Sequence, residues 1–139
     1  MFTSVATRPA AAYTKIAVET GVDRASPHDL VSMLFVGLLQ ALASARGALE
    51  RGDIKAKCQQ VGVAVRILDE GLRAALNLRE GGAIAANLQA LYGYCVVRLT
   101  KANARNDAAA LREVVRLIEP VASSWKQIGA ADMAALQAA

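Results

Sequence analysis

The sequence predicts an all-α protein, folded as an antiparallel up-down four-helix bundle behind a mobile N-terminal arm. Apolar residues recur at spacings of three and four in four successive segments, which is typical of helices that bury one face. Only three prolines and ten glycines interrupt the 139 residues, so long helices can form within a single domain. A few residues join each segment to the next, and such short joints place consecutive helices antiparallel.

Three parts of the chain differ in patterning. Residues 1–25 have few large apolar side chains and are predicted to be the arm. Residues 26–129 carry the helical periodicity of the bundle, and the alanine-rich residues 130–139 are expected to form a frayed or helical tail. Ser26 and Pro27 mark the start of the bundle, because a serine hydroxyl can cap a helix and proline suits its first position.

The predicted helices cover residues 26–51, 53–77, 82–103 and 107–129. Each has one apolar stripe expected to face the core: Val31, Leu34, Phe35, Leu38, Leu42, Ala45 and Leu49; Ile54, Val61, Val65, Leu68, Leu72 and Leu76; Ile84, Leu88, Leu91, Cys95, Leu99 and Ala102; Leu111, Val114, Val115, Ile118, Val121, Trp125 and Ile128. Asp53 and Asp107 are expected to cap the second and fourth helices. Pro120 interrupts the hydrogen-bond ladder of the fourth helix and is expected to kink it.

Little in the chain indicates catalysis. One histidine and two separated cysteines are too few to form a metal site, and no convergent polar residues are found for catalysis, so we predict no enzyme activity, no cofactor and no metal. His28 is expected to be exposed or to cap its helix, and Cys58 and Cys95 to be small core residues in a reducing compartment. With no apolar run of transmembrane length and no secretory signal at the start, a cytoplasmic protein without membrane insertion is predicted.

Two helices have more apolar width than one core stripe needs. Tyr92 and Val96 extend the stripe of the third helix, and Val63 and Ile67 lie beside that of the second. Tyr92 is expected to point inward and Tyr94 to lie near the surface. The extra width fits either a surface that binds a partner peptide or a broad buried face, and the pattern favours neither.

A basic face offers a different class of function. Arg98, Lys101 and Arg105 share one side of the third helix, and Arg112 and Arg116 follow in the fourth. A net charge of +4 permits binding of nucleic acid through this face, residues 98–116. The alternative is an ordinary solvated face, which the lack of interleaved aromatic residues favours.

Several short motifs occur in an order that is similar to one known family. They are Ser26-Pro27-His28, Glu50-Arg51-Gly52-Asp53, Gly81-Gly82 followed by Asn87-Leu88, Leu91-Tyr92 with Tyr94, and Trp125-Lys126-Gln127-Ile128. From about Ala12 to Ile128 the chain resembles the flagellin-specific export chaperones of bacterial flagella, the FliS family. Val36 and Gly93 depart from that pattern, since aspartate is usual in the family at both positions.

The resemblance implies a chaperone that binds the disordered C-terminal segment of flagellin, prevents premature polymerisation, and delivers flagellin to the export gate. It also implies an arm that covers the apolar groove, with Tyr13 contacting the export-gate membrane protein, and no cofactor. Other flagellar regulators are further candidate partners; nucleic acid is not among the partners implied. For the flagellin-binding groove we predict Ile54, Val61, Val65, Ile67, Tyr92 and Val96.

Overall fold

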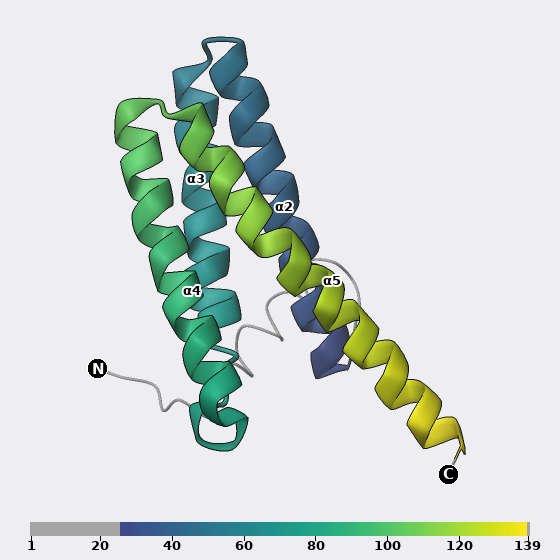
Figure 1. Ribbon diagram of the computed structural model, residues 1–139. Helices are drawn as coiled ribbons and strands as arrows, with labels where there is room; N and C mark the ends of the chain where they lie inside the picture. Colours follow the sequence, from purple (N-terminus) through teal and green to yellow (C-terminus); the bar gives the residue numbers. More distant parts are fainter. Residues whose placement is uncertain (1–25, 139) are drawn as a thin grey trace.

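A computed structural model describes residues 26–138, and the side chains of residues 26–129. The described chain forms α2 (Pro27–Glu50), α3 (Ile54–Arg66), a π-helix η1 (Ile67–Arg73), α4 (Leu78–Arg105) and α5 (Ala108–Ala138). Figure 1 shows α2, α3 and α4 running up and down beside one another, as the all-α four-helix bundle predicts. The predicted arm, residues 1–25, lies outside the described residues.

Local side-chain chemistry sets the helix ends. Ser26, Asp53 and Asp107 each accept a hydrogen bond of 3.1 Å from the backbone N–H three residues later, as expected of N-caps. Asn77 caps α4 in the same way at 3.0 Å, which the sequence analysis did not foresee. Asn106 ends α4 in the left-handed region, at φ 53°, where asparagine is tolerated.

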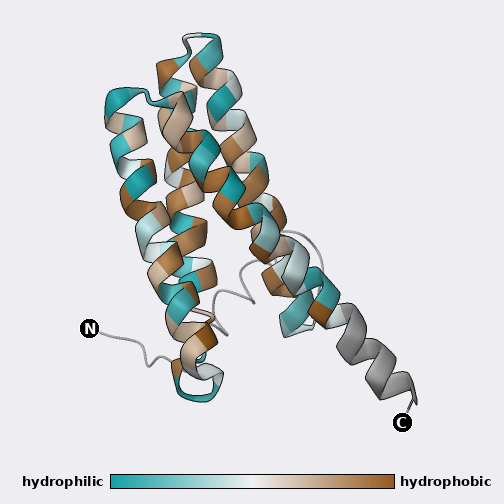
Figure 2. Cartoon of the chain, in the orientation of Figure 1, coloured by the Kyte–Doolittle hydropathy of each residue, from teal (hydrophilic) through white to brown (hydrophobic). Residues whose placement is uncertain are grey.

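The core runs along the facing sides of the four α-helices. Its buried residues include Leu34, Phe35, Leu38, Leu42, Val61, Leu68, Leu72, Tyr92, Cys95, Leu99, Leu111, Val114 and Ile118. Figure 2 shows hydrophobic residues recurring along every helix of the bundle. α2 has the length and composition of a helix that could cross a membrane, although no run of that kind was expected. Nine of its residues are buried in the bundle, as in the core helix of a soluble protein.

The predicted second helix is divided. α3 ends at Arg66 and the chain continues as η1, in which each turn is wider. Within η1 Gly71 lies against Leu34, where a Cβ atom would stand 3.0 Å from Leu34 Cδ2. This close approach favours the interpretation of this glycine as a site of tight helix packing. Gly62, by contrast, has open space where its side chain would be.

One further expectation was wrong, and one buried residue was not anticipated. Cys58 is exposed, because it lies on the flank of α3 rather than on its core stripe. Lys57, which was assigned no role, is buried instead and donates to Asn103 of α4.

The last helix, α5, is not aligned with α2, α3 and α4, which lie side by side. Figure 1 shows α5 starting beside the end of α4, crossing α2 obliquely and projecting past the first turns of α2. It remains helical across Pro120. This oblique course leaves the second half of α5 opposite the start of α4, and the candidate site lies between them.

Candidate functional site

An apolar pocket with a volume of about 550 Å³ lies between the start of α2, η1 and the turn after it, the first half of α4, and the second half of α5. Its lining consists of Val31, Phe35, Leu72, Ala75, Leu76, Asn77, Gly81, Ile84, Ala85, Leu88, Tyr92, Pro120, Val121, Ser124, Trp125 and Ile128. Among these described residues none is charged. The pocket therefore suits large apolar side chains of a ligand or partner.

The rim of the pocket is unusually apolar for a surface. Ile84 on α4 is 74% exposed and Ile128 on α5 is 52% exposed. Both belong to the lining, on the two walls that α4 and α5 supply. Exposed aliphatic side chains around a pocket are typical of a binding surface, because an isolated domain gains nothing from leaving them in water.

A kink lies at the start of α4, two residues before the exposed Ile84. Gly82 adopts φ 55° and ψ −135°, a conformation that only glycine adopts readily. The turn before Gly82 is capped by Asn77, and the regular helix resumes after it. Ile84 was predicted to face the core, and this prediction is wrong because its side chain lies at the edge of the pocket, where no neighbouring helix covers it.

The floor of the pocket is buried and neutral. Tyr92 is 3% exposed, and burial together with the nearby Cys95 raises its pKa to about 12. Burial, with Glu113 nearby, raises the pKa of Cys95 to about 11. Both groups keep their protons at neutral pH, so Tyr92 presents no phenolate to the pocket, and Cys95, which does not line the pocket, provides no thiolate beside it. Nor do the described residues contain any cluster of His, Cys, Asp and Glu that could hold a metal ion.

His28 and Trp125 join α2 to α5 at one end of the pocket. Their rings are stacked with centroids 4.7 Å apart and planes 8° apart. His28 is half-buried and is not the helix cap, a role that Ser26 fills. The expectation of an exposed or capping histidine is therefore wrong, because a contact between residues 97 positions apart decides its environment.

Comparison with known proteins shows the family of this chain. A family model described as flagellar protein FliS matches residues 9–132. The chain belongs to the FliS family. The flagellar secretion chaperone FliS of Salmonella typhimurium is 49% identical over 84% of this chain and 87% of its own length.

Two other relatives are similar over the same part of the chain. Flagellar secretion chaperone FliSB of Pseudomonas aeruginosa is 43% identical over 84% of this chain and 91% of its own. FliS of Vibrio cholerae is 38% identical over 84% and 85%. All three are named as chaperones, a non-enzymatic role, which agrees with the predicted absence of enzyme activity.

The six residues predicted for the groove do not form one surface in this FliS-family protein. Tyr92 alone lines the pocket. Val61 is buried in the core and does not line the pocket. Three residues, Val65, Ile67 and Val96, are half-buried against the core outside the pocket. Ile54 is exposed at the start of α3 and does not line the pocket, and Tyr13 lies outside the described residues.

The pocket-lining residues that were not predicted as site residues come mostly from the predicted core stripes. Leu88 and Val121 were predicted to be core residues, and they do pack against the core while also lining the pocket. Periodicity alone cannot distinguish a core residue from a pocket-lining residue, because both kinds lie on the inner face of a helix. The Gly81-Gly82 pair was the one local signal for a change of direction at this place.

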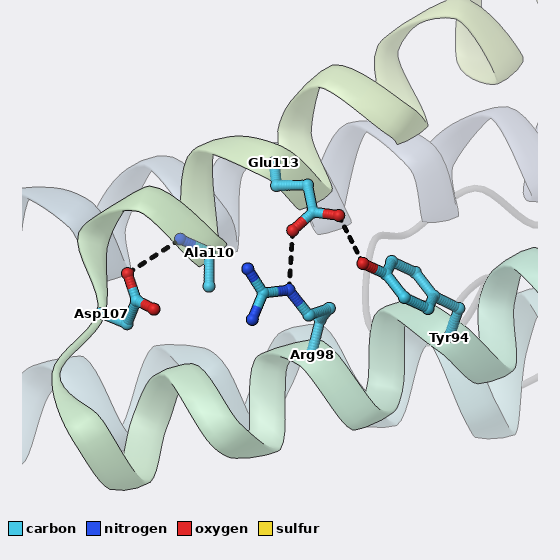
Figure 3. A network of polar contacts seen from close by, with 5 residues as sticks. All are labelled: Tyr94, Arg98, Asp107, Ala110 and Glu113. Carbon is cyan, nitrogen blue, oxygen red and sulfur yellow. Dashed lines mark hydrogen bonds and ion pairs between the residues drawn. The ribbon is translucent and has the colours of Figure 1, made fainter.

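The proposed basic face is partly neutralised within the chain. Glu113 of α5 accepts hydrogen bonds from the Tyr94 hydroxyl and, at 2.6 Å, from Nε of Arg98, both on α4 (Figure 3). These two donors hold the pKa of Glu113 below its ordinary value, and Glu113 in turn raises the pKa of Tyr94 and of Arg98. Arg98 therefore ties α4 to α5, which leaves the face with one fewer free cation for nucleic acid.

Proposed function

We propose that this FliS-family protein is a cytoplasmic flagellar secretion chaperone that binds the disordered C-terminal segment of flagellin in the pocket between α4 and α5. By covering that segment it prevents premature polymerisation, and it delivers flagellin to the flagellar export gate. The observation that carries the proposal is the uncharged pocket of about 550 Å³ with exposed isoleucines on two of its walls. Family membership supports the wider role in flagellar secretion.

The chemistry of the pocket matches an amphipathic polypeptide segment. Large apolar side chains of such a segment would enter between Ile84 and Ile128, while its polar side chains remained in water. Each buried leucine or phenylalanine contributes about 1.5–3 kcal/mol, so three of them contribute about 5–9 kcal/mol. Ordering a disordered segment costs about 2–5 kcal/mol, which leaves weak binding for the pocket alone. Tight capture therefore requires that flagellin also contact surface outside the pocket.

The N-terminal arm is well placed in the sequence to regulate access. Residues 1–25 lead directly to Ser26, and Val31, one turn into α2, lines the pocket. We propose that the arm covers the pocket in the free protein and that flagellin displaces it. Tyr13 of the released arm would then contact the cytosolic part of the export-gate membrane protein.

Calorimetric titration with a synthetic peptide of the flagellin C-terminal segment tests the site. Ile84→Asp and Ile128→Asp each place a charge on the apolar rim and should weaken peptide binding about 10–100-fold, since burying one isoleucine contributes about 1.5–3 kcal/mol. Because both side chains are largely exposed, these variants should keep the helical circular-dichroism spectrum of the wild type. An aspartate at the buried Tyr92 would test folding instead of binding.

Val36→Asp is the matched control. Val36 is 56% exposed on α2 and does not line the pocket, so its variant should bind the peptide as the wild type does. Unchanged affinity in both rim variants would show that the peptide binds elsewhere. If the arm covers the pocket, deletion of residues 1–20 should raise the association rate; an unaltered rate would remove the arm from the proposal while leaving the pocket in place.

A further inference from the structure

His28 is held to α5 by a reciprocal pair of hydrogen bonds as well as by stacking. Its Nε2 donates to the Trp125 carbonyl oxygen at 2.8 Å, and Trp125 Nε1 donates to the His28 carbonyl oxygen at 3.1 Å. Since a carbonyl oxygen only accepts, Nε2 must carry the hydrogen in this contact. Each residue thus binds the other through both its ring and its backbone, which fixes the local distance between the start of α2 and the second half of α5.

Gly129 makes room for this contact. A Cβ atom at that position would lie 1.9 Å from Cε1 and 2.3 Å from Nε2 of His28. No side chain fits at this position while the His28 ring keeps its place. The imidazole therefore stacks on the indole of Trp125 and also occupies the space beside the bare backbone of Gly129, one helical turn further along α5. The glycine is required by the position of the histidine ring.

Pro120 weakens the hydrogen-bond ladder of α5 nine residues before Gly129. It has no backbone N–H, so the carbonyl of Arg116 lacks its partner in the helical ladder, and its ring crowds that carbonyl. A helix bends most readily where one ladder bond is missing. Pro120 itself is exposed, so its ring contributes little to the core packing of α5.

The wall of the pocket lies between these two features. Val121, Ser124 and Trp125 line the pocket after Pro120. We propose that residues 121–129 of α5 form a movable wall, hinged at Pro120 and held closed by His28, and that His28 is the residue that sets the width of the pocket. The device concerns the shape of the pocket and does not depend on what binds there.

Distances between spin labels measure the position of this wall. Cysteines replace Lys126 on the wall and Arg79 at the start of α4, both exposed, in a background with Cys58→Ser. Cys95 is buried and its pKa is about 11, so it should not take up label at neutral pH. A second labelled pair, 79 with 112, uses an exposed position of α5 before the hinge and serves as the reference.

In the wild type we expect a narrow distance distribution for both pairs. His28→Ala should lengthen and broaden the distribution between 79 and 126 and leave that between 79 and 112 unchanged. The label lies about 9 Å beyond the hinge, so a bend of about 20–30° moves it by about 3–5 Å. Adding Pro120→Ala to His28→Ala restores the ladder bond and should return the distribution toward that of the wild type.

An unchanged 79–126 distribution in His28→Ala would overturn the role of His28, and an equally broad one in the double variant would overturn the hinge. If His28→Ala loses its helical spectrum, Gly129→Ala provides the second route, because its methyl group displaces the imidazole without removing it. That variant should also lengthen the 79–126 distance alone, and a wild-type distribution in it would equally refute the proposal. Emission from Trp125, the single tryptophan of the chain, should shift to longer wavelength in both variants as its ring loses the histidine.

Discussion

Replacing Lys57 with methionine tests how the bundle satisfies the end of α4. Lys57 is only 2% exposed, and its Nζ donates to both the backbone oxygen and Oδ1 of Asn103, each at 2.7 Å. Asn103 lies in the last turn of α4, where helix carbonyls lack partners and carry partial negative charge. Lys57 of α3 thus supplies hydrogen-bond donors to the last turn of α4, which α4 itself cannot provide.

The structure sets the size of the expected effect. Methionine fills a similar volume without a donor, so two acceptors lose their partner at a cost of about 1–3 kcal/mol each. Removing the ammonium group from the interior offsets part of this loss of stability, because a buried charge is poorly solvated. We expect Lys57→Met to lower the free energy of unfolding by about 2–3 kcal/mol, and the midpoint of thermal unfolding by about 10 °C for a chain of this size.

Urea unfolding followed by circular dichroism measures the difference. Lys55→Met is the matched control, since Lys55 is exposed on the same helix and its replacement should change stability by less than about 0.5 kcal/mol. Asn103→Ala in both backgrounds isolates the contribution of Oδ1, with a coupling energy of about 1 kcal/mol expected. A Lys57→Met protein as stable as the wild type, or more stable, would refute the reasoning, because it would mean that desolvation of the lysine outweighs its two hydrogen bonds.

Three other substitutions test the surroundings of single residues. The Tyr94 hydrogen bond is the main cause of the low pKa of Glu113, so Tyr94→Phe should raise the Glu113 midpoint in a carboxyl NMR titration. Because that pKa is lowered in the folded protein, the stabilisation by Glu113 is present above the unfolded pKa and is lost as the pH falls through the folded pKa; an unmoved midpoint would contradict the assignment. Gly62→Ala should stabilise by about 0.5–1 kcal/mol, because no atom lies within 4 Å of the added methyl. Gly71→Ala should destabilise by about 1–3 kcal/mol through its contact with Leu34, and equal effects on urea midpoints would show that local space does not decide the outcome.

Features that depend on neighbours in the chain were predictable from the sequence. Ser26, Asp53 and Asp107 cap the helices as expected, because a capping side chain reaches a backbone N–H only three residues away. Tyr92 points inward and Tyr94 lies at the surface, since two positions along a helix differ by about half a turn. The helical pattern therefore determined the all-α class and most of the core.

The division between core and pocket was decided by tertiary structure. Val61 and Leu88 look alike in the pattern, yet one is enclosed and the other lines the pocket. The difference depends on which helices the fold packs against each residue, and no local signal in the sequence encodes that packing.

Contacts between residues that are distant in the sequence depend on the folded arrangement of the helices. The sequence by itself determined the helices, their caps and their buried faces, because these follow from interactions within one or two turns. Only the folded arrangement brought His28 to Trp125 and Lys57 to Asn103. Such pairs depend on the angle and register at which whole helices pack, which the summed contacts of many side chains determine together.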